Sequence, residues 1–213
     1  MSLTSKITRE NLDKFLSKYT TEEKTLDIGS GGSSYDRFFP NRTAIDVDPE
    51  RKPDIVADAH KLPFNNEEFG TILCTEVLEH LHSPETAISE MERVLKKDGL
   101  LILTTRFIFP IHDAPNDYYR FTKYGLRHLF RNWEIVDLQE ETNTKDTFAV
   151  LFQRIGFQTK LRFNKASKFL TFLTAKFIQK SPQPILKEYG DIKKTKEETN
   201  ILTSGYYLIC RKR

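Results

Sequence analysis

Hydrophobic residues along this chain fall into short runs of Ile, Leu and Val that alternate with helical patterns as far as residue 140. This alternation is typical of βαβ units, in which helices cover both faces of a mostly parallel sheet. Strands are predicted at residues 25–28, 43–47, 54–57, 71–74, 100–104, 133–140 and 205–211, and a leading helix at residues 8–19. The pattern therefore predicts a fold of the α/β class.

Two further helices carry recognisable end signals. Ser83 can cap a helix that begins at Pro84, a residue that suits the first helical position. Gly99 can take the left-handed conformation that closes this helix after Lys97. A second helix is predicted directly after Thr122, where an apolar stripe begins.

The link between the second and third strands is unusually short. Only residues 49–53 separate them, whereas a parallel crossover normally needs a dozen or more residues. We therefore expect an extended loop without a helix, followed by a short third strand at the edge of the sheet.

The composition is that of one globular domain spanning residues 1–213. With 38% hydrophobic residues, a chain of this length can bury roughly 70% of its unfolded surface in one core. Cys74 and Cys210 lie in apolar runs without a CxxC partner, which predicts buried thiols in a reducing compartment. The sequence has neither a run of the roughly 20 apolar residues that span a membrane nor the apolar core of a signal peptide at its start. We therefore expect a cytoplasmic protein.

Charge is unevenly distributed along the chain. Residues 1–153 contain 19 Lys and Arg side chains against 26 Asp and Glu, whereas the rest of the chain contains 14 against 4. Residues 154–180 carry basic side chains and no acidic one, interleaved with Phe and Leu, which predicts one or two amphipathic helices. They belong to a basic helical insertion at about residues 142–200, between the last two strands, and residues 187–200 are predicted to form a flexible link.

Three roles for the basic insertion stay open. It can fold back as a lid on the acidic part of its own chain, make peripheral contact with an anionic membrane or lipid-linked substrate through residues 154–180, or bind nucleic acid. Nucleic acid ranks last because the sequence shows no dedicated base-recognition module. We therefore expect a small-molecule or glycan acceptor as partner, with membrane association left open.

The first predicted strand ends in a glycine-containing turn, Asp27-Ile28-Gly29-Ser30-Gly31. Glycine lets the backbone bend tightly and approach a ligand that a Cβ atom would block. Asp46 ends the second strand, where a carboxylate can accept hydrogen bonds from both hydroxyls of a ribose. Ser34 stands where the GxGxxG fingerprint of dinucleotide sites needs its last glycine, which disfavours a pyrophosphate cofactor.

Five segments in order resemble the class I, Rossmann-like S-adenosylmethionine-dependent methyltransferases, in particular their small-molecule type 11 branch. These segments are residues 26–31 (LDIGSG), 44–50 (AIDVDPE), 56–64 (VADAHKLPF), 76–81 (EVLEHL) and 93–99 (RVLKKDG). The resemblance implies a three-layer, mostly parallel sheet with strand order 3-2-1-4-5-7-6 and an antiparallel last strand. It also implies S-adenosylmethionine as cofactor and S-adenosylhomocysteine as product.

The resemblance assigns cofactor contacts to ten positions. Asp27, Gly29, Ser30 and Gly31 would hold the methionine part, Asp46 and Val47 the ribose, Asp58 and Ala59 the adenine edge, and Thr75 and Glu76 the reactive end. The sequence departs from the family pattern at Ser33, which replaces a third glycine, and at Gly70, which replaces an acidic residue. The missing helix after the second strand is a third departure.

Histidines follow two strands at the edge where ligands bind in open α/β sheets. His80 and His82 come after the fourth strand and His112 after the fifth. Methyl transfer to oxygen benefits from a base, and histidine is the side chain used most often. We therefore predict His80 and His112 as the catalytic bases.

A metal site is an alternative use of the same residues. Glu76, Glu79 and His80 are spaced so that a helix would place them on one face, and His112 could approach from the next loop. Such a mixed set suits manganese, iron or zinc better than magnesium. The string resembles that of ubiquinone-pathway O-methyltransferases and of small-RNA terminal 2'-O-methyltransferases, and in the latter a further histidine completes a metal site. In the plainer alternative, only Glu76 contacts the cofactor.

Residues 110–122 are too polar and aromatic for a simple connector and are predicted to be the substrate loop. Asp117, Tyr118, Tyr119 and Arg120 would stack on and hydrogen-bond a sugar or ring, and the loop resembles that of bacterial methyltransferases of surface-glycan and secondary-product pathways. Packing of the aromatic side chains onto the next helix is the alternative.

These observations favour O-methylation of a small hydroxylated, glycan or lipid-linked acceptor. Metal-assisted 2'-O-methylation of RNA or of a vicinal diol is a second hypothesis. A non-catalytic cofactor-binding protein is a third.

Overall fold

The computed structural model describes residues 4–32 and 35–213, so the predictions for Ser33 and Ser34 lie outside the described residues. The chain forms two compact units. The sheet unit comprises Leu16–Arg106, Ile111–Gln139 and Tyr206–Arg213. The helical unit comprises the N-terminal residues through Phe15, Phe107–Pro110 and Glu140–Gly205. Each unit is described by itself below.

The strands are β1 (Thr25–Ile28), β2 (Arg42–Asp46), β3 (Ile55–Val56), β4 (Phe69–Thr75), β5 (Leu95–Arg106), β6 (Glu134–Glu140), β7 (Glu188–Tyr189), β8 (Glu197–Glu198) and β9 (Gly205–Arg211). The α-helices are α1 (Ile7–Leu16), α2 (Pro84–Val94), α3 (Lys123–Leu129), α4 (Thr144–Gln158) and α5 (Asn164–Lys180).

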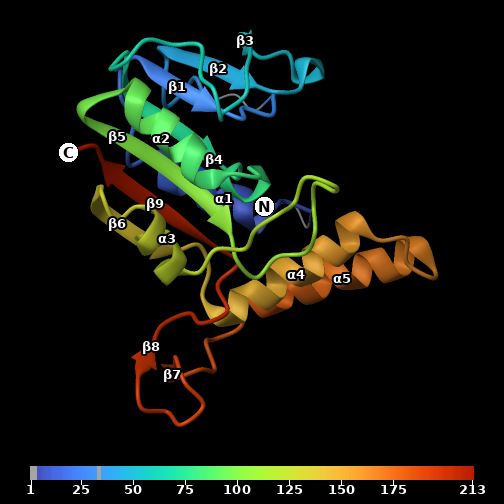
Figure 1. Cartoon of the computed structure of the whole chain (residues 1–213). Helices are drawn as coiled ribbons and strands as arrows, with labels where there is room; N and C mark the ends of the chain where they lie inside the picture. The colour runs from blue at the N-terminus through green and yellow to red at the C-terminus, as the bar shows by residue number, and fades with distance from the viewer. Residues whose placement is uncertain (1–3, 33–34) are drawn as a thin grey trace. The chain divides into compact units, whose positions relative to one another are not determined.

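The seven-stranded sheet has the order β3-β2-β1-β4-β5-β9-β6, which confirms the predicted order (Figure 1). The strands β3 to β5 run parallel, and β9 is antiparallel to its neighbours, as predicted. Ile28 at the end of β1 pairs with Ile45 of β2 and with Cys74 of β4. The carboxyl ends of the three strands therefore align at one edge, where the loops that follow them meet. Cys74 and Cys210 are fully buried in β4 and β9, as predicted.

The boundary between α2 and β5 differs from the prediction. The helix ends at Val94 and the strand begins at Leu95, because Leu95 is fully buried and pairs with Phe69 of β4. Ser83 precedes the helix but makes no side-chain capping bond. Asp98, not Gly99, takes the left-handed conformation, with φ 61°. A Cβ atom on Gly99 would lie 2.9 Å from the carbonyl oxygen of Gly70, so glycine is needed there for close packing.

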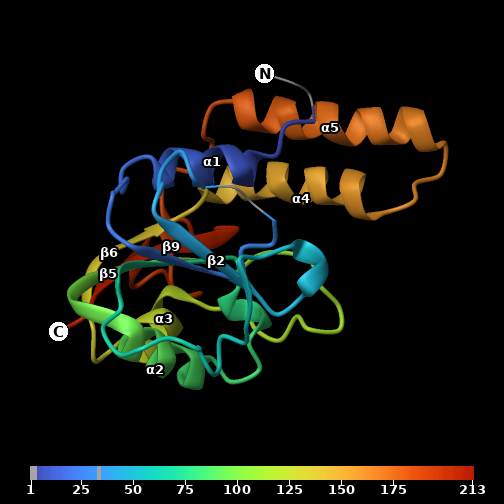
Figure 2. The ribbon, with the colours of Figure 1, turned by 90° about the horizontal axis from the view of Figure 1, so that it is seen from above.

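Other boundaries follow the sequence closely. The third strand is an exposed two-residue edge strand, as expected. The link before it contains one 3-10 turn, Pro49–Arg51, where we predicted only extended chain, and Asp48 caps this turn by accepting from the backbone N–H of Glu50. Thr122 caps α3 by accepting from the N–H of Gly125, as its position predicted. The helices α2 and α3 lie along the same face of the sheet (Figure 2).

The helical unit is built around the antiparallel hairpin of α4 and α5, which lie side by side in both views (Figures 1 and 2). Its core joins Ile7 of α1 to Ala149 and Val150 of α4 and Ala175 of α5. Residues 187–200, predicted as a flexible link, contain the antiparallel pair β7 and β8. Among the described residues, no helix has the length and apolar character required to cross a bilayer.

Candidate active site

A cavity of about 710 Å³ opens in the sheet unit at the carboxyl ends of β1, β2 and β4. Its volume falls in the range of about 300–1,000 Å³ that is usual for sites of small ligands. The described residues that line it come from five loops: Ile28, Gly29, Gly31, Asp46, Val47, Asp48, Arg51, Ala57, Asp58, Ala59, His60, Glu76, Val77, His80, Leu81, His82, His112, Asp113, Asn116 and Tyr118. Most of the predicted cofactor residues are therefore found around one hollow.

The glycine turn after β1 adopts the conformation for which glycine is suited. Gly29 and Gly31 have φ values of 64° and 56°, in the left-handed region that L side chains rarely enter. A Cβ atom on Gly29 would lie 2.4 Å from Cγ2 of Val77, so this position also lacks space for a side chain. The turn thus brings bare backbone to the cavity wall, which suits a ligand that packs closely against it.

Asp46 at the end of β2 is held in place by two backbone groups. Its Oδ2 accepts from the N–H of Gly31 at 2.9 Å, and its Oδ1 accepts from the N–H of Asp48 at 3.0 Å. A carboxylate has about four acceptor positions, so both oxygens can still accept a hydroxyl. This fixed carboxylate beside the glycine turn fits the two hydroxyls of a ribose.

Three predicted cofactor residues are not among the described residues that line the cavity. Asp27 is fully buried beneath the turn and forms an ion pair of 2.7 Å with Arg42. Burial raises the pKa of Asp27 to about 7, although Arg42 acts in the opposite direction. Ser30 is also buried, and Thr75 shares a hydrogen bond of 3.2 Å with the hydroxyl of Tyr35. Their positions are those of supports for the turn and for the end of β4.

A stacked pair of histidines forms the wall next to Asp58 and was missed by the sequence analysis. His60 Nδ1 lies 2.6 Å from Asp58 Oδ1, and His60 Nε2 accepts from the backbone N–H of Ser83 at 3.3 Å. Its Nδ1 therefore carries the proton and donates to Asp58. The rings of His60 and His82 stack at 4.1 Å. No local sequence pattern predicts the stacking of these two rings, because they come from different loops.

His80 and His112 meet at the cavity, as the sequence analysis expected of neighbouring loops. Their Nε2 atoms are 3.0 Å apart. His80 Nδ1 lies 2.8 Å from the carbonyl oxygen of Asn116, which can only accept, so Nδ1 carries the proton and Nε2 presents a lone pair to His112. Burial and the nearby His80 lower the pKa of His112 to about 4. His112 is therefore neutral at physiological pH.

Glu79 completes a cluster with these two histidines. Its carboxylate is fully buried, and Oε2 accepts from the hydroxyl of Thr105 at 2.7 Å. Within the described part of the chain, Oε1 has no hydrogen-bond donor, and it lies 3.9 Å from His112 Nε2. One potential ligand atom from each of Glu79, His80 and His112 lies within 4.8 Å of the others. The three side chains thus converge in a manner that can hold a divalent cation.

Glu76 stands apart from this cluster, and the predicted helical face was wrong. Glu76 has a left-handed φ of 58°, and a 3-10 turn, Leu78–His80, takes the place of the helix. The carboxylate of Glu76 pairs with Arg106, whose side chain is almost fully buried. The backbone N–H of Glu76 donates to the carbonyl of Thr104 on the neighbouring strand at 3.0 Å, which holds this conformation. Glu76 nevertheless lines the cavity, as predicted for a residue near the reactive end.

The predicted substrate loop is internally braced. Asp117 is almost fully buried, accepts from the backbone N–H of His112 at 3.0 Å, and receives both terminal nitrogens of Arg120 at 2.6 and 2.8 Å. The guanidinium of Arg120 holds the pKa of Asp117 well below its usual range. Tyr119 donates its hydroxyl proton to the carbonyl of His82. Of the four predicted substrate residues, Tyr118 lines the cavity, and the others fix the loop around it.

Comparison with known proteins agrees with this geometry. Residues 26–103 match the family described as methyltransferase domain. A methyltransferase of unknown function from Bacillus subtilis, YcgJ, is 31% identical over 115 residues, covering 45% of this chain and 43% of that one. A ubiquinone biosynthesis O-methyltransferase from Glaesserella parasuis is 28% identical over 106 residues, covering 39% and 45%. Residues 26–103 thus carry a methyltransferase domain, and the similarity supports a class I, S-adenosylmethionine-dependent enzyme.

The fold of the chain is also similar to that of solved structures. A putative methyltransferase from Bacillus halodurans superimposes with a TM-score of 0.58 at 17% identity, covering 96% of this chain and 98% of the other. At that identity the likeness shows the fold alone. The chain spans less than half the length of the curated relatives it matches.

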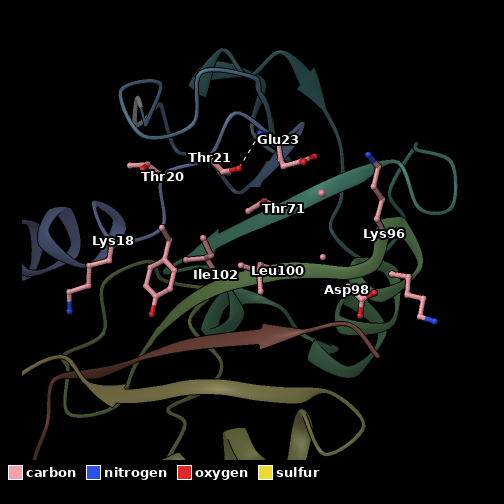
Figure 3. A pocket seen from close by; sticks show the side chains of 13 residues that line it. Lys18, Thr20, Thr21, Glu23, Thr71, Lys96, Asp98, Leu100 and Ile102 are labelled. Carbon is pink, nitrogen blue, oxygen red and sulfur yellow. Dashed lines mark hydrogen bonds between the residues drawn. The ribbon is translucent and has the colours of Figure 1, made fainter.

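A second hollow of the methyltransferase, of about 540 Å³, lies at the start of β4 and β5 (Figure 3). Thr71, Leu100 and Asp98 line it, with Lys18 and Lys96 at its margins. Ligands of open α/β sheets bind at the carboxyl ends of the strands, and this hollow lies at the opposite ends. A Cβ atom on Gly70 would lie 2.6 Å from Oε2 and 3.1 Å from Cβ of Glu23, so a larger residue at position 70 would require the Glu23 side chain to move.

Proposed function

We propose that this methyltransferase transfers a methyl group from S-adenosylmethionine to a hydroxyl oxygen of a small acceptor, such as a sugar or a lipid-linked glycan. One observation carries the proposal: the facing histidines His80 and His112 line the same cavity as the glycine turn and Asp46. The proposed cofactor-binding residues and a candidate base thus line the same cavity. The relative from Glaesserella parasuis is named an O-methyltransferase, which supports oxygen as the accepting atom.

The cofactor residues fit a sulfonium nucleoside. The backbone at Gly29 and Gly31 would pack against the methionine part, Asp46 would accept the ribose hydroxyls, and Asp58 and Ala59 would border the adenine. The bound cofactor supplies an electrophilic methyl group, so alignment of acceptor, carbon and sulfur is the main task of the protein. Alignment of this kind can lower the activation free energy by about 7–11 kcal/mol.

The histidine pair would take up the acceptor proton. The acceptor oxygen would bond to the methyl carbon as the carbon–sulfur bond breaks, and the sulfur would keep the electron pair. With the Nδ1 protons of His80 and His112 directed at Asn116 and Asp117, the hydroxyl proton would bind one of the two facing Nε2 atoms. Because His112 is neutral above its pKa of about 4, this acceptor is available at physiological pH. The Asn116 carbonyl and the Asp117 carboxylate would stabilise the positive charge that results.

Calorimetry with S-adenosylhomocysteine and turnover assays with hydroxylated acceptors test this proposal. The Asp46→Ala variant should lose cofactor binding without unfolding, whereas Glu85→Ala, on the exposed start of α2, should bind normally. The His112→Gln variant should keep cofactor affinity and lose about 10²–10⁴-fold in turnover, the usual contribution of a general base. Absence of cofactor binding by the unaltered protein would overturn the proposal. Normal binding without turnover across a broad acceptor panel would favour the non-catalytic alternative.

A specific observation favours metal-assisted transfer as a second candidate function. The lone pair of His80 Nε2 faces His112 Nε2, and the buried Oε1 of Glu79, which has no hydrogen-bond donor in the described chain, lies beside them. A manganese, iron or zinc ion would satisfy all three groups. Such an ion would bind two neighbouring hydroxyls of a vicinal diol or an RNA terminus and acidify one of them. On this hypothesis a chelator abolishes turnover and leaves S-adenosylhomocysteine affinity intact.

A further inference from the structure

The hairpin of α4 and α5 carries an apolar stripe that neither helix uses for packing. Five large side chains of the hairpin's outer part are exposed: Phe163, Phe169, Leu170, Leu173 and Phe177. Phe163 and Phe177 expose 76% and 73% of their surface, values at which an aromatic ring is almost wholly in water. Scattered exposed apolar residues are ordinary, but a contiguous group marks a binding surface.

The stripe is a true face of α5. Leu170, Leu173 and Phe177 follow the spacing of i, i+3 and i+7, which places them in one row along a helix. The opposite side of α5 is used for packing: Phe172 and Ala175 are buried, and the Phe172 ring lies 4.9 Å from that of Phe157 on α4. The hairpin is therefore held together by one face of α5 while it presents the other.

Basic residues border this face. Between Arg154 and Lys180 the chain has no acidic side chain, and its basic ones are Arg154, Lys160, Arg162, Lys165, Lys168, Lys176 and Lys180. At 100° per residue, Lys180 falls beside Leu173 in the apolar row, while Lys165 and Lys176 fall between Phe169 and the packed side of the helix, from where their long side chains can reach outward. A surface with an apolar centre and a cationic border is complementary to lipid: acyl chains at the centre and anionic headgroups around them.

We propose that the outer face of the α4–α5 hairpin docks on an anionic membrane surface. This inference goes beyond the proposed chemistry and does not rest on it, because it uses other residues. The 17-residue α5 is shorter than the roughly 20 residues that span a bilayer, so the helix would lie in the interface. Nucleic acid would meet the same charges and could stack on the phenylalanine rings, but it would leave the aliphatic Leu170 and Leu173 without an apolar partner. Lipid accounts for both the charges and the stripe.

Vesicle flotation with the full chain tests this docking. The protein should float with vesicles of phosphatidylcholine and phosphatidylglycerol and stay behind with phosphatidylcholine alone, and added salt should weaken the binding. Charge reversal by Lys165→Glu and Lys180→Glu together should weaken binding by about tenfold or more. Phe169→Ser with Phe177→Ser should weaken it similarly. All four side chains are exposed or half-exposed, so folding should be retained, which circular dichroism would verify.

Matched controls lie in the same unit. Ile192 is fully exposed in the loop between β7 and β8, and Lys193 follows it, so Ile192→Ser and Lys193→Glu should leave vesicle binding unchanged. A Phe169→Trp variant should show a blue shift of its fluorescence with anionic vesicles, because the native Trp133 is buried. Equal binding of hairpin and control variants, failure to bind anionic vesicles, or binding to single-stranded RNA in place of vesicles would each overturn the proposal.

Discussion

His80 and His112 face each other through their Nε2 atoms at 3.0 Å, and His80 has already committed its Nδ1 proton to the carbonyl of Asn116. Only one proton fits between the two facing nitrogens. His112 is enclosed, and both its burial and its neighbour oppose a positive charge. The arrangement therefore keeps a neutral imidazole beside the glycine turn and Asp46, where an acceptor hydroxyl would need a base.

This relationship predicts the titration of His112. NMR of histidine-labelled protein should show that His112 stays neutral until the pH falls to about 4. The His80→Gln variant should raise the pKa of His112, because His80 is one of the groups that lower it. A His112 midpoint near the ordinary value of about 6.5 in the unaltered protein would contradict the geometry.

The same shift predicts how stability depends on pH. The unfolded histidine binds its proton near pH 6.5, whereas folded His112 does so only near pH 4. Between these values the unfolded chain binds more protons, so the free energy of unfolding should fall as the pH falls through this window. Chemical denaturation of the His112→Gln variant should show a smaller fall. His128, on the outer part of α3, offers a control substitution, His128→Gln.

Another prediction concerns Asp117, which braces the predicted substrate loop. Asp117 joins the backbone of His112 to the guanidinium of Arg120, so Asp117→Asn leaves a partly buried arginine without its counter-charge. Because the carboxylate of Asp117 is nearly buried and accepts these bonds, we expect a loss of about 1–3 kcal/mol in stability and a drop in turnover, with S-adenosylhomocysteine affinity unchanged. Thermal denaturation and calorimetry measure the two effects. The exposed Asp113→Asn should leave stability within about 0.5 kcal/mol.

The sheet could be predicted because its signals are local. The strand β1, most of β4 and β5 from Leu101 onward are runs of buried residues, and the motifs that end β1 and β2 place the turn and Asp46. The histidines of the active site were found for the same reason, since loops after adjacent strands meet at one edge of a parallel sheet.

The errors lie where long-range contacts override local periodicity. Glu76, Glu79 and His80 have helical spacing, yet Glu76 takes a left-handed conformation because its N–H is bound by Thr104 of the next strand. The helix α2 stops at Val94 because the sheet takes Leu95 as a core residue. No spacing along the sequence could reveal either partner.

The glycine turn predicts that alanine substitutions at Gly29 and Gly31 have different effects on cofactor binding. Gly29→Ala should abolish cofactor binding, because its Cβ atom would clash with Val77 as well as strain the backbone. Gly31→Ala should weaken cofactor binding by about 1–2 kcal/mol, the strain of a left-handed alanine, because its Cβ atom would meet nothing closer than 3.8 Å. The double variant Gly29→Ala/Val77→Ala should recover part of the binding. Calorimetry with S-adenosylhomocysteine ranks the three, and a Gly31 variant worse than the Gly29 variant would refute this account.

A last prediction separates the metal hypothesis from simple base catalysis. If Glu79, His80 and His112 hold a cation, manganese or zinc should raise the melting temperature, since a ligand that binds only the folded state stabilises it. Glu79→Gln replaces one ligand oxygen with an amide and should lower metal affinity by about tenfold or more. The natural control is Glu76→Gln, because Glu76 lines the same cavity but pairs with Arg106, outside the cluster. If metal raises the melting temperature of the two variants equally, the ion binds elsewhere. If turnover survives both chelation and Glu79→Gln, the histidine pair acts as a base without a metal.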